Sequence, residues 1–264
     1  MSSPPIGIST ASLYPEELEK ALQFLAENGI GQTELFFNCM TEIEPEFTRL
    51  YRNCTRDYGI RIAATHPFTC PLEPLLFFSG YQRRTQESLE LYRKFFDFTA
   101  EVGGNIFVFH GAKYQTPCED QQYFDVFGQL QDLATQSGVI IAQENVCRCK
   151  SRSLDFLKDM KAYLGDKALF TLDLKQAIRS EESPFAIIDA LGSSIVHLHI
   201  SDSTAENDCL VPLDGTFDFD GLFRQMEALS YQGVYLVEVY RNSYREASDL
   251  VEKVHIFTDR YQLS

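Results

Sequence analysis

The sequence predicts an α/β protein that folds as a single (β/α)8 barrel, also called a TIM barrel. Eight short apolar runs rich in β-forming residues, helical spacing between them, and a length of 264 residues indicate this fold. Strict alternation of strands and helices implies right-handed crossovers and a parallel sheet, and eight such units close more naturally into a barrel than into an open sheet. No low-complexity linker divides the chain, so we expect residues 1–264 to form one domain.

The predicted strands are short apolar runs bounded by turn residues. In chain order they cover residues 6–10, 33–37, 60–66, 105–110, 139–144, 169–174, 195–200 and 234–240. Helical spacing is clearest in residues 15–29, 81–104, 123–138 and 217–233, and each of these segments ends on the glycine that a helix C-terminus favours. An open doubly wound sheet is the alternative, but the early segment ISTASLYP lacks the glycine-rich first turn of that fold.

The composition excludes several classes of protein. A net charge of -15 disfavours binding to nucleic acid or anionic membranes, because both depend on Lys and Arg meeting phosphates. No stretch approaches the ~20 apolar residues that cross a bilayer, and the N-terminus does not resemble a secretory signal. The seven cysteines lack the spacing of a disulfide framework and suit reduced thiols. We therefore expect a cytoplasmic protein with small ligands and with no nucleic-acid or membrane partner.

Four polar residues lie at the ends of four consecutive predicted strands. They are Glu144, Asp173, His199 and Glu238. Taken singly, the carboxylates are also what helix caps, turns and solvated rims use, and the histidine could be a core residue bonded to backbone. The combination favours a shared site, because in barrels of this kind the carboxyl ends of the strands build the active site.

Three carboxylates buried together repel one another unless a cation lies between them. Three oxygen donors and one imidazole suit a single divalent metal ion, and Mn2+, Co2+, Mg2+ and Zn2+ all accept such ligands. A cation of this kind can polarise the carbonyl of a hydroxyketone and stabilise an enediolate. The sequence therefore predicts one divalent metal ion as the cofactor, bound by the four residues.

Two further histidines, His66 and His110, end earlier predicted strands. Each could orient a substrate, serve a second metal ion, or simply pack at the barrel mouth. His197 precedes His199 in the same strand, and we expect it to point to the opposite face, toward helices or solvent. We do not expect His197 to be a ligand.

These residues together resemble the xylose isomerase-like barrel superfamily, which contains sugar-phosphate isomerases and epimerases, ketose 3-epimerases, inosose dehydratases and apurinic endonucleases. The segments that carry the resemblance are ISTASLYP, ATHPF, VFHG, QEN, LDLKQA, HLHISD and VEVY. The resemblance implies a metal ion held by Glu144, Asp173, His199 and Glu238, with Glu144 and Glu238 also forming the acid–base pair. It implies that His66 and His110 contact the substrate.

The sequence departs from the family pattern in three places. Gln176 replaces the histidine often found three residues after the strand-six aspartate, and it can still hydrogen-bond a sugar hydroxyl. Ser201 stands where a lysine is common. The loop STAENDCLVPLDGTFDF after Asp202 contains no basic residue at the place where related epimerases hold part of the substrate, so Lys113 or Arg148 would have to supply the positive charge for a phosphorylated substrate.

The leading functional hypothesis is a metal-dependent isomerase or epimerase that acts on a small sugar or sugar phosphate by proton transfer through an enediolate. Three alternatives stay open: an inosose dehydratase-like lyase, an apurinic endonuclease-like zinc phosphodiesterase, and a non-catalytic sugar-binding barrel. The net charge disfavours the second of these.

The segment PLEPLLFFSGYQ gathers apolar side chains, Leu75 and Phe78 among them, in a loop or short helix. It is either a lid or pocket wall, or the subunit interface of a homo-oligomer.

Overall fold

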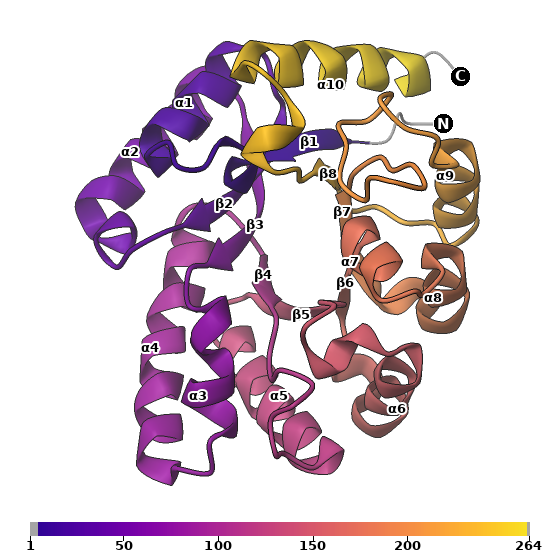
Figure 1. Cartoon of the computed structure of the whole chain (residues 1–264). Coiled ribbons are helices and arrows are strands. Elements are labelled where there is room, and N and C mark those ends of the chain that lie inside the picture. Colours follow the sequence, from indigo (N-terminus) through magenta and orange to yellow (C-terminus); the bar gives the residue numbers. More distant parts are fainter. Residues whose placement is uncertain (1–4, 263–264) are drawn as a thin grey trace.

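The structure is a computed structural model that describes residues 5–262, and within them eight parallel strands close into one barrel (Figure 1). The strands follow one another around the ring in chain order, and the last pairs with the first. They are β1 (Ile6–Ser9), β2 (Gln32–Phe37), β3 (Arg61–Pro67), β4 (Ile106–Phe109), β5 (Ile140–Glu144), β6 (Phe170–Asp173), β7 (Ile195–Ile200) and β8 (Tyr235–Val237). The predicted fold class is confirmed.

Helices surround the barrel on the outside (Figure 1). They are α1 (Leu18–Glu27), α2 (Pro45–Tyr58), α3 (Glu73–Phe78), α4 (Gln82–Glu101), α5 (Asp120–Thr135), α6 (Leu154–Leu164), α7 (Leu174–Arg179), α8 (Pro184–Leu191), α9 (Phe219–Ala228) and α10 (Ala247–Gln262). No helix within residues 5–262 is both long and apolar enough to cross a bilayer. Their apolar faces pack on the outer face of the sheet in one continuous core.

All eight predicted strands are present, and they differ from the predictions mainly at their ends. Strand β6 ends at Asp173 because the Asp173 side chain caps α7, where its Oδ1 accepts a hydrogen bond from Gln176 N at 2.8 Å. Strand β8 ends at Val237 rather than at Tyr240. Glu238 N still donates to Ile200 O at 3.1 Å, so Glu238 keeps a fixed place directly after the strand.

The apolar segment after β3 forms the short helix α3. Phe77 and Phe78 are buried, and Phe77 lies edge-on to Tyr92 and Phe109. Leu75 is exposed. The aromatic half of the segment therefore belongs to the core, and only its outer face is available for a lid or an interface.

A small apolar layer lies inside the barrel, apart from the main core. Its buried members are Ala64, Ile106, Val108 and Ala142. Residues two apart on a strand share a face, so Glu144 continues the inward-facing row that contains Ala142. The polar site therefore rests on an apolar floor, which favours tight electrostatic interactions among the groups above it.

Candidate metal centre

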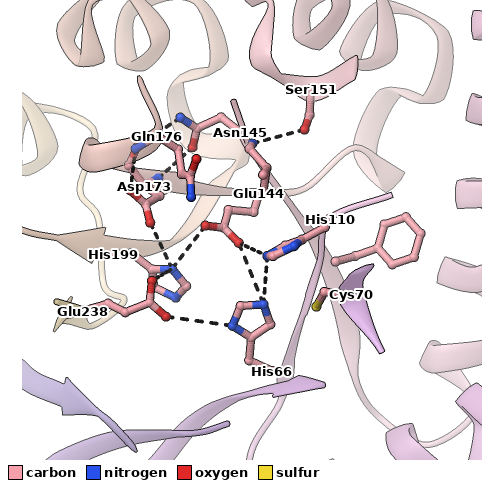
Figure 2. Close-up of polar contacts among 12 residues, drawn as sticks. His66, Cys70, His110, Glu144, Asn145, Ser151, Asp173, Gln176, His199 and Glu238 are labelled. Atoms are coloured by element: carbon pink, nitrogen blue, oxygen red, sulfur yellow. Dashed lines mark hydrogen bonds and ion pairs between the residues drawn. The ribbon is translucent and has the colours of Figure 1, made fainter. Parts of the chain in front are cut away.

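The side chains of Glu144, Asp173, His199 and Glu238 meet at the carboxyl end of the barrel (Figure 2). His199 Nδ1 lies 3.7 Å from Glu144 Oε1, 3.8 Å from Asp173 Oδ2 and 3.6 Å from Glu238 Oε2. One ligand atom from each of the four residues lies within 4.8 Å of the others. The structure therefore brings together the whole set that the sequence singled out.

Local structure explains why these groups converge. Glu144 is the last residue of β5 and Asp173 is the last residue of β6. Asn145 ties the two strand ends together, because its Nδ2 donates to Asp173 O at 3.0 Å and its Oδ1 accepts from Asp173 N at 2.7 Å. Since Asp173 uses Oδ1 to cap α7, its Oδ2 is left facing the centre.

The donor set fits a divalent cation. Within residues 5–262, the buried His199 Nδ1 has no hydrogen-bond partner, although it faces three carboxylates. Burial lowers the pKa of His199, but the charges of Glu34 and Glu238 outweigh burial and raise that pKa well above its ordinary value. The same negative field attracts a metal ion, which would accept the Nδ1 lone pair in place of a proton.

Glu34 is a site residue that the sequence reasoning missed. It lies in the middle of β2, fully buried, and its Oε2 is 3.0 Å from His197 Nε2 and 3.1 Å from His199 Nε2. Burial raises the pKa of Glu34, but the two histidines hold it well below its ordinary value. Because the Glu34 carboxylate accepts a hydrogen bond from His199 Nε2–H, the lone pair of His199 Nδ1 is free and points to the centre. The sequence signal for Glu34 was an acidic residue inside the otherwise apolar strand TELFF.

The expectation that His197 points away from His199 is wrong. Residues two apart on a strand share a face, so both rings project into the barrel. His197 is fully buried, and it contacts the same Glu34 oxygen as His199. The His197 ring faces neither the outer helices nor solvent, and it contacts Glu34, which also contacts His199.

The two earlier histidines lie beside the four groups, next to Glu144 (Figure 2). His110 Nε2 is 2.6 Å from Glu144 Oε2 and 2.9 Å from His66 Nε2. Burial and the neighbouring charge of His110 lower the pKa of His66 to about 3, so its ring is neutral near neutral pH. His66 Nδ1 lies 3.9 Å from Glu238 Oε1, which places the ring between the two glutamates.

Gln176, the two candidate phosphate-binding residues and Asp202 have different surroundings in the structure. Gln176 Oε1 accepts a hydrogen bond from Cys147 N at 3.1 Å, which fixes the amide on the β5 side of the centre. Lys113 and Arg148 are exposed on loops that follow β4 and β5. Asp202 is buried and accepts hydrogen bonds from several backbone N–H groups of the loop after β7, including those of Leu213 and Gly215 at 3.0 and 2.9 Å.

A family model described as xylose isomerase-like TIM barrel matches residues 13–258. The chain belongs to this family. An inosose dehydratase of Clostridium beijerinckii is 25% identical over 177 residues, a match that covers 54% of this chain and 59% of that protein. Among solved structures, the 3-keto-D-glucoside 4-epimerase of E. coli superposes with a TM-score of 0.79 at 17% identity, over 97% of this chain and 99% of the other. A D-allulose 3-epimerase of Methylomonas sp., solved with D-allulose, superposes with a TM-score of 0.80 at 18% identity, over 99% of this chain and 98% of the other.

A buried lysine also lies in the centre of this xylose isomerase-like barrel. Lys175 Nζ is 3.0 Å from Asp173 Oδ2 and 3.0 Å from Glu238 Oε2. Burial lowers the pKa of Lys175, but the two carboxylates raise it well above its ordinary value. Lys175 lies in the first turn of α7, directly after the strand end that carries Asp173.

Glu73, the first residue of α3, holds the backbone at His110 in the xylose isomerase-like site. It is fully buried, its Oε2 accepts hydrogen bonds from His110 N at 3.0 Å and Gly111 N at 2.5 Å, and Tyr92 Oη donates to its Oε1 at 2.9 Å. Gly111 has a φ of +80°, and a Cβ there would overlap the Tyr123 side chain. The turn after β4 therefore requires glycine, and Glu73 holds it in place.

Glu73 is expected to make the stability of the protein depend on pH. Burial raises the pKa of Glu73 from its ordinary 4.5 to about 7. The folded protein holds this proton more tightly than the unfolded chain does, so the resulting stability is complete below the unfolded pKa and is lost as the pH rises through about 7. Glutamine does not titrate, so Glu73→Gln should not lose this stability as the pH rises. Between low and high pH, the free energy of unfolding of the variant should therefore gain about 3 kcal/mol relative to that of wild type.

Urea unfolding of both proteins at about pH 4 and about pH 8 measures this shift. Glutamine keeps an acceptor for the backbone N–H groups of residues 110 and 111, so the variant is expected to fold. A difference in unfolding free energy that is the same at both pH values would show that Glu73 titrates normally.

Proposed function

We propose that the protein is a metal-dependent isomerase or epimerase of a small sugar, acting by proton transfer through an enediolate. The observation that carries the proposal is the convergence of three carboxylates on the unpartnered His199 Nδ1. Membership of the xylose isomerase-like family and the names of the epimerases of similar fold support the choice of a sugar as substrate.

In this proposal Glu144, Asp173, His199 and Glu238 hold the cation. A divalent ion bound there supplies positive charge that polarises the sugar carbonyl and stabilises the enediolate. Glu144 and Glu238 reach the centre from β5 and from the end of β8, so they can act on different faces of one carbon. One glutamate removes the proton next to the carbonyl, and the other returns a proton to the opposite face.

The residues around Glu144 suit its role. Burial raises the pKa of Glu144, but the charge and hydrogen bond of His110, together with His199, hold it well below its ordinary value. Glu144 is therefore present as a carboxylate that can accept a proton. His66, His110 and Gln176 surround the same region and are proposed to bind sugar hydroxyls through their ring and amide nitrogens.

Metal removal tests the proposed function. Protein stripped with a chelator is expected to lose the interconversion of aldoses, ketoses or their epimers, and to regain it when Mn2+ or Co2+ is added, because the enediolate charge is uncompensated without the ion. The assay is a panel of free and phosphorylated sugars, followed by chromatography of the products. Undiminished activity in the stripped protein, or no activity on any sugar after reloading, would contradict the proposal.

A lyase reaction is the second candidate, and the 25% identity to an inosose dehydratase favours it specifically. The same enediolate can expel a β-hydroxyl as water instead of being reprotonated. The two reactions are separated by their products, because elimination creates a conjugated ketone that absorbs ultraviolet light and epimerisation does not. The sugar panel should therefore include cyclic polyol ketones.

A further inference from the structure

Lys175 is a buried ammonium group inside the candidate metal centre. Only 3% of its surface is exposed, and it lies two residues after Asp173, in the first turn of α7. Its Nζ is 3.0 Å from Asp173 Oδ2 and 3.0 Å from Glu238 Oε2. A lysine is rarely buried unless it is paired, so these two carboxylates are its counter-ions.

The same two oxygens face the histidine of the centre. Asp173 Oδ2 is 3.8 Å and Glu238 Oε2 is 3.6 Å from His199 Nδ1. The atoms that would bind a metal ion are therefore the atoms that hold the ammonium group. A divalent ion and an ammonium group that share these oxygens in a desolvated site repel each other strongly, so each weakens the binding of the other.

A displaced ammonium group has an alternative position close by. Lys175 Nζ lies 5.3 Å from the centre of the Tyr240 ring, and Tyr240 is 46% exposed just beyond the end of β8. The face of an aromatic ring attracts a cation, and the flexible stem of lysine allows its charged end to move toward solvent. The Arg179 guanidinium lies 5.3 Å from the same ring and is paired with Asp208 at 2.6 Å, so a displaced Lys175 ammonium group would pass Tyr240 on its way to solvent and would not stay buried and unpaired.

Building on the proposed function, we propose that Lys175 is a tethered cation that competes with the divalent metal ion for Asp173 and Glu238. In the metal-free protein its ammonium group compensates the charge of these two carboxylates. Metal binding displaces the ammonium group toward Tyr240. Lys175 thus stabilises the empty centre and weakens metal binding, which makes the bound ion easier to exchange.

Replacement of Lys175 by methionine tests the competition, because methionine is of similar length and carries no charge. We expect Lys175→Met to bind Mn2+ at least about tenfold more tightly than wild type, as measured by competition with a fluorescent chelator. Without metal the variant should melt at a lower temperature than wild type, and saturating Mn2+ should raise its Tm by more. Lys158→Met is the matched control, since it makes the same change in net charge at an exposed ion pair with Asp155 on α6.

Equal or weaker Mn2+ binding by Lys175→Met, with wild type binding the ion normally, would overturn the competition and leave the proposed function intact. If only the variant binds Mn2+, Co2+, Mg2+ or Zn2+, the competition is supported and the metal requirement of the proposed function is contradicted. If neither protein binds any of these ions, both proposals fail.

Discussion

Replacement of Glu238 or Glu144 by glutamine is expected to reduce kcat by about a thousandfold, because a neutral amide cannot accept or return the proton that the reaction moves. Both residues contact the same two groups, His66 and His199, from opposite sides of the site. The variants should be assayed at saturating Mn2+, so that any weakening of metal binding does not limit the rate. Exchange of the substrate carbon-bound hydrogen in D2O reports the proton transfer directly.

The control for these variants is Glu42→Gln. Glu42 is also a buried glutamate, but its carboxylate accepts a hydrogen bond from Asn38 N and lies outside the centre. It should retain wild-type kcat and wild-type hydrogen exchange. Retention of kcat by Glu238→Gln or Glu144→Gln, with the metal bound, would remove that residue from the acid–base pair.

Asp173→Asn is expected to weaken Mn2+ binding by more than about a hundredfold. Loss of a residue that only hydrogen-bonds to a metal ligand typically weakens binding by less than this. Asparagine keeps one oxygen that can accept the hydrogen bond from Gln176 N, so the N-terminus of α7 should remain capped. The second oxygen and the negative charge are lost from the centre. Isothermal titration with Mn2+, together with Tm values with and without the ion, measures the effect.

Asp218→Asn is the matched control for Asp173→Asn. Asp218 caps α9 in the same way, because its Oδ1 accepts a hydrogen bond from Gly221 N at 2.8 Å. Both variants lose one negative charge at a helix N-terminus, and Mn2+ should protect only Asp218→Asn against heat. Equal Mn2+ affinity in the two variants would show that Asp173 serves only as a cap.

The fold could be predicted because its determinants are local and repeated. Short apolar runs alternate with helical spacing eight times, and closure into a barrel follows from the number of units. Glu144, Asp173, His199 and Glu238 could be singled out because parallel strands deliver their carboxyl ends to one rim. That geometry needs no knowledge of side-chain packing.

The missed residues are those whose role depends on contacts across the barrel. Glu34 lies mid-strand, and only the closed ring brings it to His197 and His199 from the opposite side. Lys175 was not singled out, because nothing in LDLKQA shows that Asp173 caps a helix whose first turn returns the lysine to the centre. The error at His197 came from misapplying the two-residue period of a strand.

Several expectations from the sequence stay predictions. They are the extent of the domain over residues 1–264, the cytoplasmic location, the absence of nucleic-acid and membrane partners, and pairing into a homo-oligomer. The use of Lys113 or Arg148 for a phosphate group also stays a prediction.

The central claim is that four side chains bind one divalent ion, and anomalous diffraction from crystals grown with Mn2+ tests it most directly. The expected result is one strong peak within about 2.4 Å of donor atoms from Glu144, Asp173, His199 and Glu238. A map with no peak among these residues, or with the ion bound elsewhere in the barrel, would contradict the claim.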